Sequence, residues 1–131
     1  MRNIAIFGAS GAIGGALTEH LAHLYPDAML TAFSRRLRTY NSPRINSRIL
    51  NYENEVEIET AAELVAEKGP LDLVIVASGL LHDDETMPEK SLRDLSGDKF
   101  LKLFNVNTVT PAIVAKHFIP RLNTDTPAIF A

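Results

Sequence analysis

The chain has 131 residues, of which 46% are hydrophobic and 22% charged, and its formal net charge is −3. This composition predicts a single folded domain, excludes an intrinsically disordered chain and argues against a general nucleic-acid binder. There is neither an apolar run of membrane-spanning length nor a signal peptide, so we expect a cytoplasmic protein with no membrane partner. Cysteine is absent, which excludes disulfides, a thiolate nucleophile and a cysteine-based metal site.

Short apolar runs alternate with stretches of helical periodicity along the chain. We expect strands at 3–7, 28–33, 47–51, 71–77 and from 128 onward. We expect helices at 13–24, 57–68 and about 98–122, with Pro111 as a possible kink in the last one. This alternation predicts an α/β fold, a Rossmann-type doubly wound parallel sheet with helices on both faces.

Ligands of such sheets bind at the carboxyl ends of the strands, which places the segments after Phe7, Phe33 and Ala77 on one rim. The first of these segments reads GASGAIGG and opens a helix. Glycine there permits a tight turn and close approach of the backbone to a pyrophosphate, and the helix start offers free N–H groups. We predict that the dinucleotide contacts Gly8, Ser10, Gly11, Ala12, Ile13 and Gly14.

The alternative is that this glycine loop only connects strand to helix. A branched side chain in the Gly14→Val variant is therefore expected to remove cofactor binding with little loss of fold.

The second segment, Ser34-Arg35-Arg36, stands where NAD-binding domains usually carry an acidic residue for the ribose hydroxyl. A hydroxyl and two guanidinium groups suit a 2′-phosphate, so we predict NADP(H), with NAD possible. The alternative is that these arginines only solvate a loop, because five arginines and no acidic residue lie between positions 34 and 48.

Together these residues resemble the short-chain dehydrogenase/reductase family. The glycine signature of that family, Thr-Gly-x-x-x-Gly-x-Gly, corresponds to residues 7–14, where Gly8 and Gly14 match. Phe7 replaces the threonine and Ala12 the middle glycine. The same stretch also fits the Gly-x-x-Gly-x-x-Gly spacing of the extended and atypical branches, so the motif leaves the branch open.

The resemblance implies further site residues. The Asn-Asn-Ala-Gly segment of the family falls on residues 76–79 and implies cofactor contacts from Ala77, Ser78 and Gly79. The segment FNVNTVTP puts Asn107 at the position of the catalytic asparagine, which in the family kinks the helix and holds a water of the proton relay. The adenine-contacting position after the third strand falls on Asn51, with Tyr52 beside it.

Two longer stretches, residues 79–92 and 111–122, resemble the C-factor-like members of the family. His82 lies in the first stretch, and we interpret it as a loop histidine rather than a catalytic base.

The resemblance covers the whole chain but only the first half of the family. The catalytic serine and the Tyr-x-x-x-Lys segment come later in the family, and none of the three tyrosines here has a lysine four residues on. We therefore expect residues 1–131 to form an incomplete NAD(P)-binding domain, with strand order 3-2-1-4-5 and truncated after about five strands. We also expect a homo-oligomer, because an apolar surface should remain uncovered at Ile113, Val114, Phe118, Ile129 and Phe130.

Three functions remain open at this point. The first is an NADP-dependent oxidoreductase acting on a carbonyl or alcohol substrate in its full-length form, the 131-residue chain holding the cofactor-binding half. The second is a non-catalytic NADP(H)-binding or signalling module. The third is a relative of the extended-branch epimerases and dehydratases.

Overall fold

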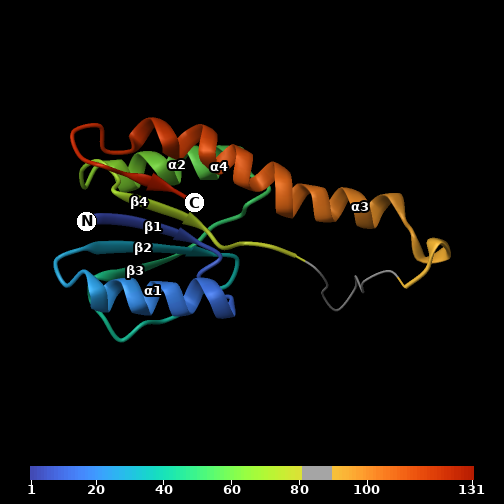
Figure 1. Cartoon of the computed structure of the whole chain (residues 1–131), viewed down its shortest axis with the longest axis horizontal. Helices are drawn as coiled ribbons and strands as arrows, with labels where there is room; N and C mark the ends of the chain where they lie inside the picture. Colours follow the sequence, from blue (N-terminus) through green and yellow to red (C-terminus); the bar gives the residue numbers. More distant parts are fainter. Residues whose placement is uncertain (81–89) are drawn as a thin grey trace.

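The computed structural model describes residues 1–80 and 90–131 and contains one parallel sheet (Figure 1). Its strand order is β3-β2-β1-β4-β5, which confirms the predicted doubly wound α/β fold. The strands are β1 (Asn3–Phe7), β2 (Met29–Ser34), β3 (Ile45–Ile49), β4 (Leu73–Val76) and β5 (Ile129–Phe130). All five residues of the central strand β1 are buried, as expected for a strand covered on both faces.

Helices cover both faces of this sheet. Helix α1 (Ala12–Leu24) packs on one face, and α2 (Glu55–Ala66) and α4 (Thr110–Phe118) pack on the other (Figure 1). On the side of α2 and α4 the core centres on aromatic rings. The Phe7 ring stacks on that of Phe33, with the ring centres 4.9 Å apart, and meets the Phe118 ring edge-on, with the centres 5.0 Å apart. The side of α1 is aliphatic and includes Ile4, Ile6 and Leu30.

The long helix predicted at about 98–122 is divided into four pieces. Helix α3 (Gly97–Phe104) runs into the π-helical turn η2 (Asn105–Val109), then into α4, and finally into the 3₁₀ turn η3 (Ile119–Arg121). Pro111 lies in the first turn of α4, where a missing N–H is tolerated, so the irregularity falls in the turn that precedes it.

The prediction of an uncovered apolar surface near the end of the chain is partly wrong. Val114 and Phe118 are fully buried, because this side of α4 packs against α2 and the sheet. Ile113 and Phe130 are partly buried against the same cluster, and only Ile129, at 50% exposed, stays open.

Helix α3 extends away from the sheet (Figure 1) and carries three exposed apolar side chains, Phe100, Leu101 and Phe104. None of its residues is buried, and Leu101 and Phe104 are 71% and 59% exposed. A shorter turn, η1 (Leu92–Asp94), precedes α3 and also exposes Leu92.

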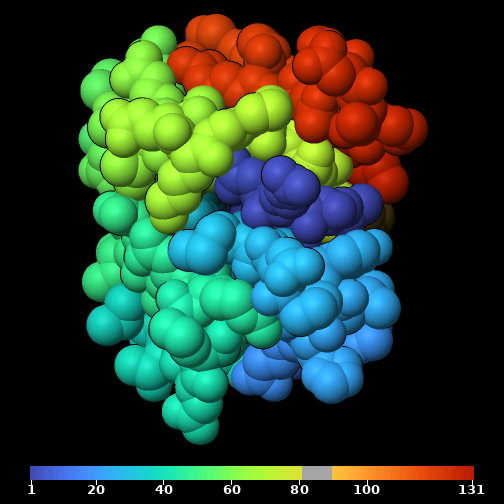
Figure 2. Space-filling view, turned by 90° about the vertical axis from the view of Figure 1, so that its left-hand side faces the viewer, coloured from blue at the N-terminus to red at the C-terminus, as the bar shows by residue number. Residues whose placement is uncertain are grey.

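The amino ends of the strands form the face shown in Figure 2, where the first residues lie between the α1–β2 connection and the segment joining α2 to β4. The Asp72 carboxylate closes this face by accepting hydrogen bonds from the N–H groups of Arg2 and Asn3 and from the Asn123 amide. Burial alone would raise the pKa of Asp72, but these hydrogen bonds outweigh burial and hold the pKa below its ordinary value. Across residues 1–80 and 90–131, none of the helices is long and apolar enough to cross a bilayer.

Candidate functional site

A cleft of about 160 Å³ opens at the carboxyl ends of β1, β2 and β4. The structure brings together three segments predicted from the sequence, those after β1, β2 and β4, with the loop after β3 and the start of α4. The lining residues are Gly8, Ser10, Gly11, Arg35, Asn51, Tyr52, Glu53, Ala77, Ser78, Gly79, Val106 and Thr110. The other predicted residues, Ala12, Ile13, Gly14, Ser34, Arg36 and Asn107, do not line it.

Two glycines, one in the loop after β1 and one in the first turn of α1, are required for different structural reasons. Gly8 has a φ of +79°, and a Cβ there would lie 2.6 Å from the backbone nitrogen of Ser78, so no other residue fits without strain. Gly14 is helical, and a Cβ there would overlap the carbonyl of Gly8. The expectation that Gly14→Val would leave the fold intact is therefore wrong, because backbone atoms would have to move.

The loop presents backbone donors at the start of α1. Gly11 is the N-cap residue and has no side chain to accept from the N–H groups of the first turn, and that turn contains no acidic residue. The Ala9 N–H donates to the Phe33 carbonyl and the Gly11 N–H to the Gly8 carbonyl, each at 3.0 Å, which fixes the shape of the loop. A helix start of this kind suits an anionic group.

Tyr52 braces the same loop from inside the fold. Its side chain is 9% exposed, and its hydroxyl accepts from the Gly8 N–H at 2.7 Å and donates to the Phe33 carbonyl at 2.9 Å. Burial raises the pKa of Tyr52 to about 12, although the Gly8 N–H and the charge of Arg35 act in the opposite direction. The hydroxyl therefore stays protonated and links the ends of β1 and β2.

Ser34, the last residue of β2, and the two arginines that follow it differ in where their side chains lie. Arg35 lines the cleft and is exposed. Ser34 is 1% exposed, and its hydroxyl donates to the carbonyl of Arg36, so it shapes the turn. The side chain of Arg36 is exposed and lies outside the cleft lining. Arg35 is thus the residue of this trio that can meet a ligand in the cleft.

Two further arginines of this segment have structural partners. Arg44 donates to the Ala22 carbonyl at 2.9 Å and the Tyr25 carbonyl at 3.1 Å, where it satisfies acceptors at the end of α1. Arg38 pairs with Glu19 of α1 at 3.0 Å. The cluster of arginines in the sequence is therefore not a single cationic surface.

Asn107 lies in the π-helical turn and holds the segment that follows β4. Its Oδ1 accepts from the Leu80 N–H and its Nδ2 donates to the Leu80 carbonyl, both at 2.7 Å. The side chain therefore fixes the position of Gly79 and Leu80 at the mouth of the cleft, and its expected contact with a relay water stays a prediction. His82 lies outside the described residues.

Three lining residues, Glu53, Val106 and Thr110, were missed by the sequence reasoning. Glu53 is turned into the cleft because its N–H donates to Asn51 Oδ1 at 3.1 Å, a turn that an asparagine followed by polar residues could have indicated. Val106 and Thr110 enter from the far end of the chain, and their place depends on how α4 docks.

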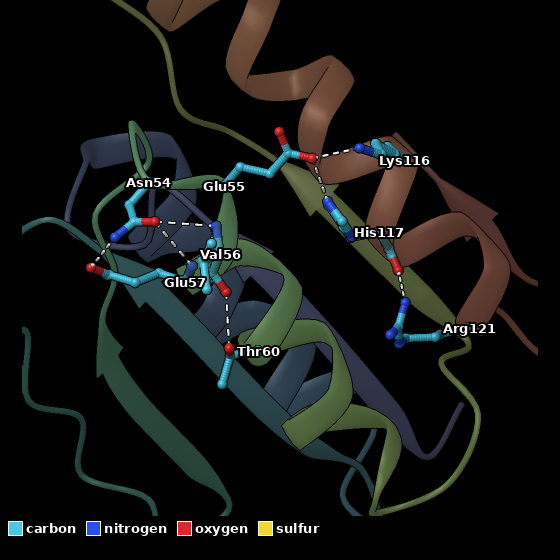
Figure 3. Close-up of polar contacts among 8 residues, drawn as sticks. All are labelled: Asn54, Glu55, Val56, Glu57, Thr60, Lys116, His117 and Arg121. Carbon is cyan, nitrogen blue, oxygen red and sulfur yellow. Dashed lines mark hydrogen bonds and ion pairs between the residues drawn. The ribbon is translucent and has the colours of Figure 1, made fainter.

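A polar cluster joins α2 to α4 (Figure 3). Asn54 caps α2 by accepting from the N–H groups of Val56 and Glu57. The next residue, Glu55, accepts from Lys116 Nζ at 2.6 Å and lies 2.9 Å from His117 Nε2. Lys116 first and His117 second hold the pKa of Glu55 below its ordinary value. Within residues 1–80 and 90–131, no group of three His, Cys, Asp or Glu side chains is placed to hold a metal ion.

No family model and no curated protein matches the sequence. Solved structures do match the fold. A short-chain dehydrogenase from Streptomyces avermitilis superimposes with a TM-score of 0.79 at 16% identity, over 99% of this chain and 48% of its own. An NADH-dependent reductase, A1-R′, solved with NAD, superimposes with a TM-score of 0.76 at 16% identity, over 98% of this chain and 57% of its own. A short-chain dehydrogenase/reductase from Serratia marcescens gives 0.74 at 15% identity, over 93% and 53%.

These similarities show that the chain has the fold of short-chain dehydrogenases/reductases. It spans about half the length of the proteins that it matches.

Proposed function

We propose that the chain is the dinucleotide-binding half of an oxidoreductase of the short-chain dehydrogenase/reductase type, which acts on a carbonyl or alcohol substrate in its full-length form. The observation that carries this proposal is the cleft itself, where the Gly8–Gly11 loop, the end of β2 and the segment after β4 meet at the start of α1. A bound nicotinamide would supply the hydride that is exchanged with the substrate carbon.

Most of the lining residues have a role in this proposal. The backbone of Gly8 to Gly11 and the uncapped start of α1 face the pyrophosphate. Arg35 meets a 2′-phosphate, while Asn51, Glu53 and the ring of Tyr52 border the base. Ala77, Ser78 and Gly79 border the remaining part of the cofactor, with their position set by Asn107. Asn107 keeps the relay role that the family resemblance implies for it, as part of this proposal.

A charge placed at Ser10 tests the proposed phosphate site. Ser10 is exposed, lines the cleft and has a negative φ, so a small side chain can be exchanged without backbone strain. The Ser10→Asp variant should bind NADPH at least about tenfold more weakly, because a carboxylate would face the phosphates. The control is Ser10→Asn, because asparagine has nearly the shape of aspartate without its charge. This variant should change the NADPH affinity by about twofold at most. Titration calorimetry measures both, and absence of NADPH and NADH binding to the unmodified chain would refute the proposal.

The cofactor preference rests on Arg35. A charge-assisted contact with a 2′-phosphate contributes about 1.5–3 kcal/mol, so Arg35→Gln should weaken NADPH binding about tenfold or more. NADH affinity should stay the same, because NADH has no phosphate at that position. Equal affinities of the unmodified chain for NADPH and NADH would contradict the preference.

One observation favours a relative of the extended branch as the second candidate. Gly11 lines the cleft and Ala12 does not, which agrees better with the Gly-x-x-Gly-x-x-Gly spacing than with Thr-Gly-x-x-x-Gly-x-Gly. The C-factor-like branch remains part of the main proposal. Product analysis of the full-length protein separates the two candidates, since an oxidoreductase consumes NADPH stoichiometrically and an epimerase or dehydratase causes no net change in nicotinamide absorbance.

We further propose that the chain forms homo-oligomers in which α3 packs against a second copy. Its exposed Phe100, Leu101 and Phe104 lie beside Asp98 and Lys99, charges of opposite sign that suit a self-complementary contact.

A further inference from the structure

The connection between β2 and β3 lies along α1 and touches the glycine loop. It spans residues 35–44, which form no helix. The hydroxyl of Tyr40 donates to the carbonyl of Ala9 at 2.8 Å, and Ala9 is 1% exposed. The outer side of the loop is thereby attached to a residue that does not line the cleft.

Arg38 attaches the same connection to α1. Its guanidinium pairs with Glu19 at 3.0 Å and lies 5.2 Å from the centre of the Tyr40 ring, so the two side chains support each other. It also rests directly on Gly15, where a Cβ would overlap the guanidinium. Gly15 lies within α1, where alanine would be the better helix former, so the space that it leaves for Arg38 accounts for the glycine.

The glycine loop is thus held from two sides by tyrosine hydroxyls. Tyr52 accepts from the Gly8 N–H on the inner side, and Tyr40 donates to the Ala9 carbonyl on the outer side. Consecutive backbone groups of the loop are fixed in this way before any ligand arrives, and a loop that is ordered in advance loses less conformational entropy on binding.

We propose that residues 35–44 form a strap that holds the glycine loop in its ligand-binding shape, with Arg38 and Tyr40 as positioning residues. This inference rests on the proposed function, because the ligand concerned is the dinucleotide. It assigns a determinant of cofactor affinity to Arg38 and Tyr40, two residues that do not line the cleft.

Gly15→Ala separates positioning from fold stability. A methyl group there displaces Arg38, whose guanidinium supplies its three nearest atoms, while helix propensity alone would raise the melting temperature. We expect a melting temperature equal to or above that of the unmodified chain, together with about fivefold weaker NADPH binding. The matched control is Gly97→Ala in α3, where a Cβ meets nothing within 4 Å and NADPH affinity should stay unchanged. Unchanged affinity in Gly15→Ala would overturn the strap.

Two further variants test whether the strap acts as a unit. Tyr40→Phe removes only the hydroxyl that donates to Ala9 and should weaken NADPH binding about fivefold, as expected for the loss of one neutral hydrogen bond. In an Arg38→Ala background, Gly15→Ala should have no additional effect, because the group that it displaces is already absent. If Arg38→Ala and Gly15→Ala had additive effects on NADPH affinity, the claim that the strap acts as a unit would be refuted.

Amide hydrogen exchange in the free protein gives a readout that needs no ligand. The Ala9 N–H is hydrogen-bonded to the Phe33 carbonyl of β2 and the Gly11 N–H to the Gly8 carbonyl. Both should exchange faster in Tyr40→Phe and Gly15→Ala, while amides of β1 keep their rates. Faster exchange in a chain that binds neither NADPH nor NADH would support the strap and refute the proposed function. NADPH binding by the unmodified chain with unchanged loop exchange in both variants would refute the strap and leave the function standing.

Discussion

At the scale of single residues, Tyr52 shows how a side chain from one loop can fix another. It follows β3 in the sequence, yet its hydroxyl is bonded to the end of β1 and the end of β2. Its removal should therefore affect the glycine loop more than its own loop, because the Gly8 N–H would lose its acceptor.

Tyr52→Phe should lower the free energy of unfolding by about 1–3 kcal/mol, the usual effect of leaving a buried donor unpaired. Tyr25→Phe is the matched control, because among residues 1–80 and 90–131 the hydrogen bonds at Tyr25 involve its backbone and none involves its hydroxyl. Urea unfolding of both variants measures the difference. Equal losses in the two variants would show that the Tyr52 hydroxyl does not support the fold.

Tyr52 also predicts how stability depends on alkaline pH. Its pKa is about 12 in the folded chain and near the ordinary value of 10.0 when unfolded. The folded state therefore keeps a proton that the unfolded state loses, and the stability gained below pH 10 should be lost as the pH rises toward 12. Urea unfolding between pH 9 and 12, a range chosen around these two values, should show this loss in the unmodified chain and a smaller one in Tyr52→Phe.

The sequence predicts residues well where local geometry decides their role. Gly8 and Arg35 line the cleft, as expected of a glycine in the tight turn after a strand and of the residue that directly follows β2. Glu53 and Thr110 were missed, since their places in the cleft depend on a side-chain turn and on the docking of a distant helix. Ser34 was assigned to the ligand, but its hydroxyl is used within its own turn.

At the scale of elements, Glu55 joins the start of α2 to the last turn of α4. Its depressed pKa means that its pairing with Lys116 and His117 stabilises the fold at pH values above the ordinary 4.5 of glutamate. That contribution should be lost as the pH falls through the lower pKa of the folded state. The effect should be modest, because the carboxylate is exposed to solvent and screened.

Glu55→Gln should thus lower the melting temperature slightly at pH 7, and the difference from the unmodified chain should vanish at acidic pH. Glu67→Gln, at the exposed C-cap of α2, is the control and should show no such dependence. Thermal melts recorded by circular dichroism from pH 7 down to acidic pH measure the melting temperatures of both variants. A constant difference down to pH 2, well below the ordinary value of 4.5, would contradict the assignment.

The helix after β4 marks the limit of element prediction from sequence. Apolar periodicity continues through residues 98–122, so the pattern indicates a single helix, whereas the structure inserts a π-helical turn at Asn105–Val109. The Asn107 side chain bonds to Leu80, a partner that no periodicity within the helix could reveal. For the same reason the sequence could not show which face of α4 meets α2, and Val114 and Phe118 were expected on the surface.

At the scale of the whole molecule, the projecting α3 should control association. Leu101→Glu should weaken self-association, because it places a charge in the centre of the exposed apolar face. Val56→Glu in α2 is the control, with a similar exposure of 68% against 71% for Leu101. Sedimentation velocity over a range of concentrations measures the oligomeric state. A monomer at every concentration in the unmodified chain would refute the homo-oligomer.

The central position of β1 also has a consequence for how the chain folds. Its first neighbour, β2, follows soon in the sequence, but its second, β4, pairs Leu73 with Ile4 across more than half of the chain. Contacts of such long sequence separation form slowly, because a large loop must close before they contribute. During synthesis the β1–α1–β2 unit can therefore assemble first, and one side of β1 stays unpaired until β4 has been made. Folding intermediates of this protein should be most prone to aggregation in that interval.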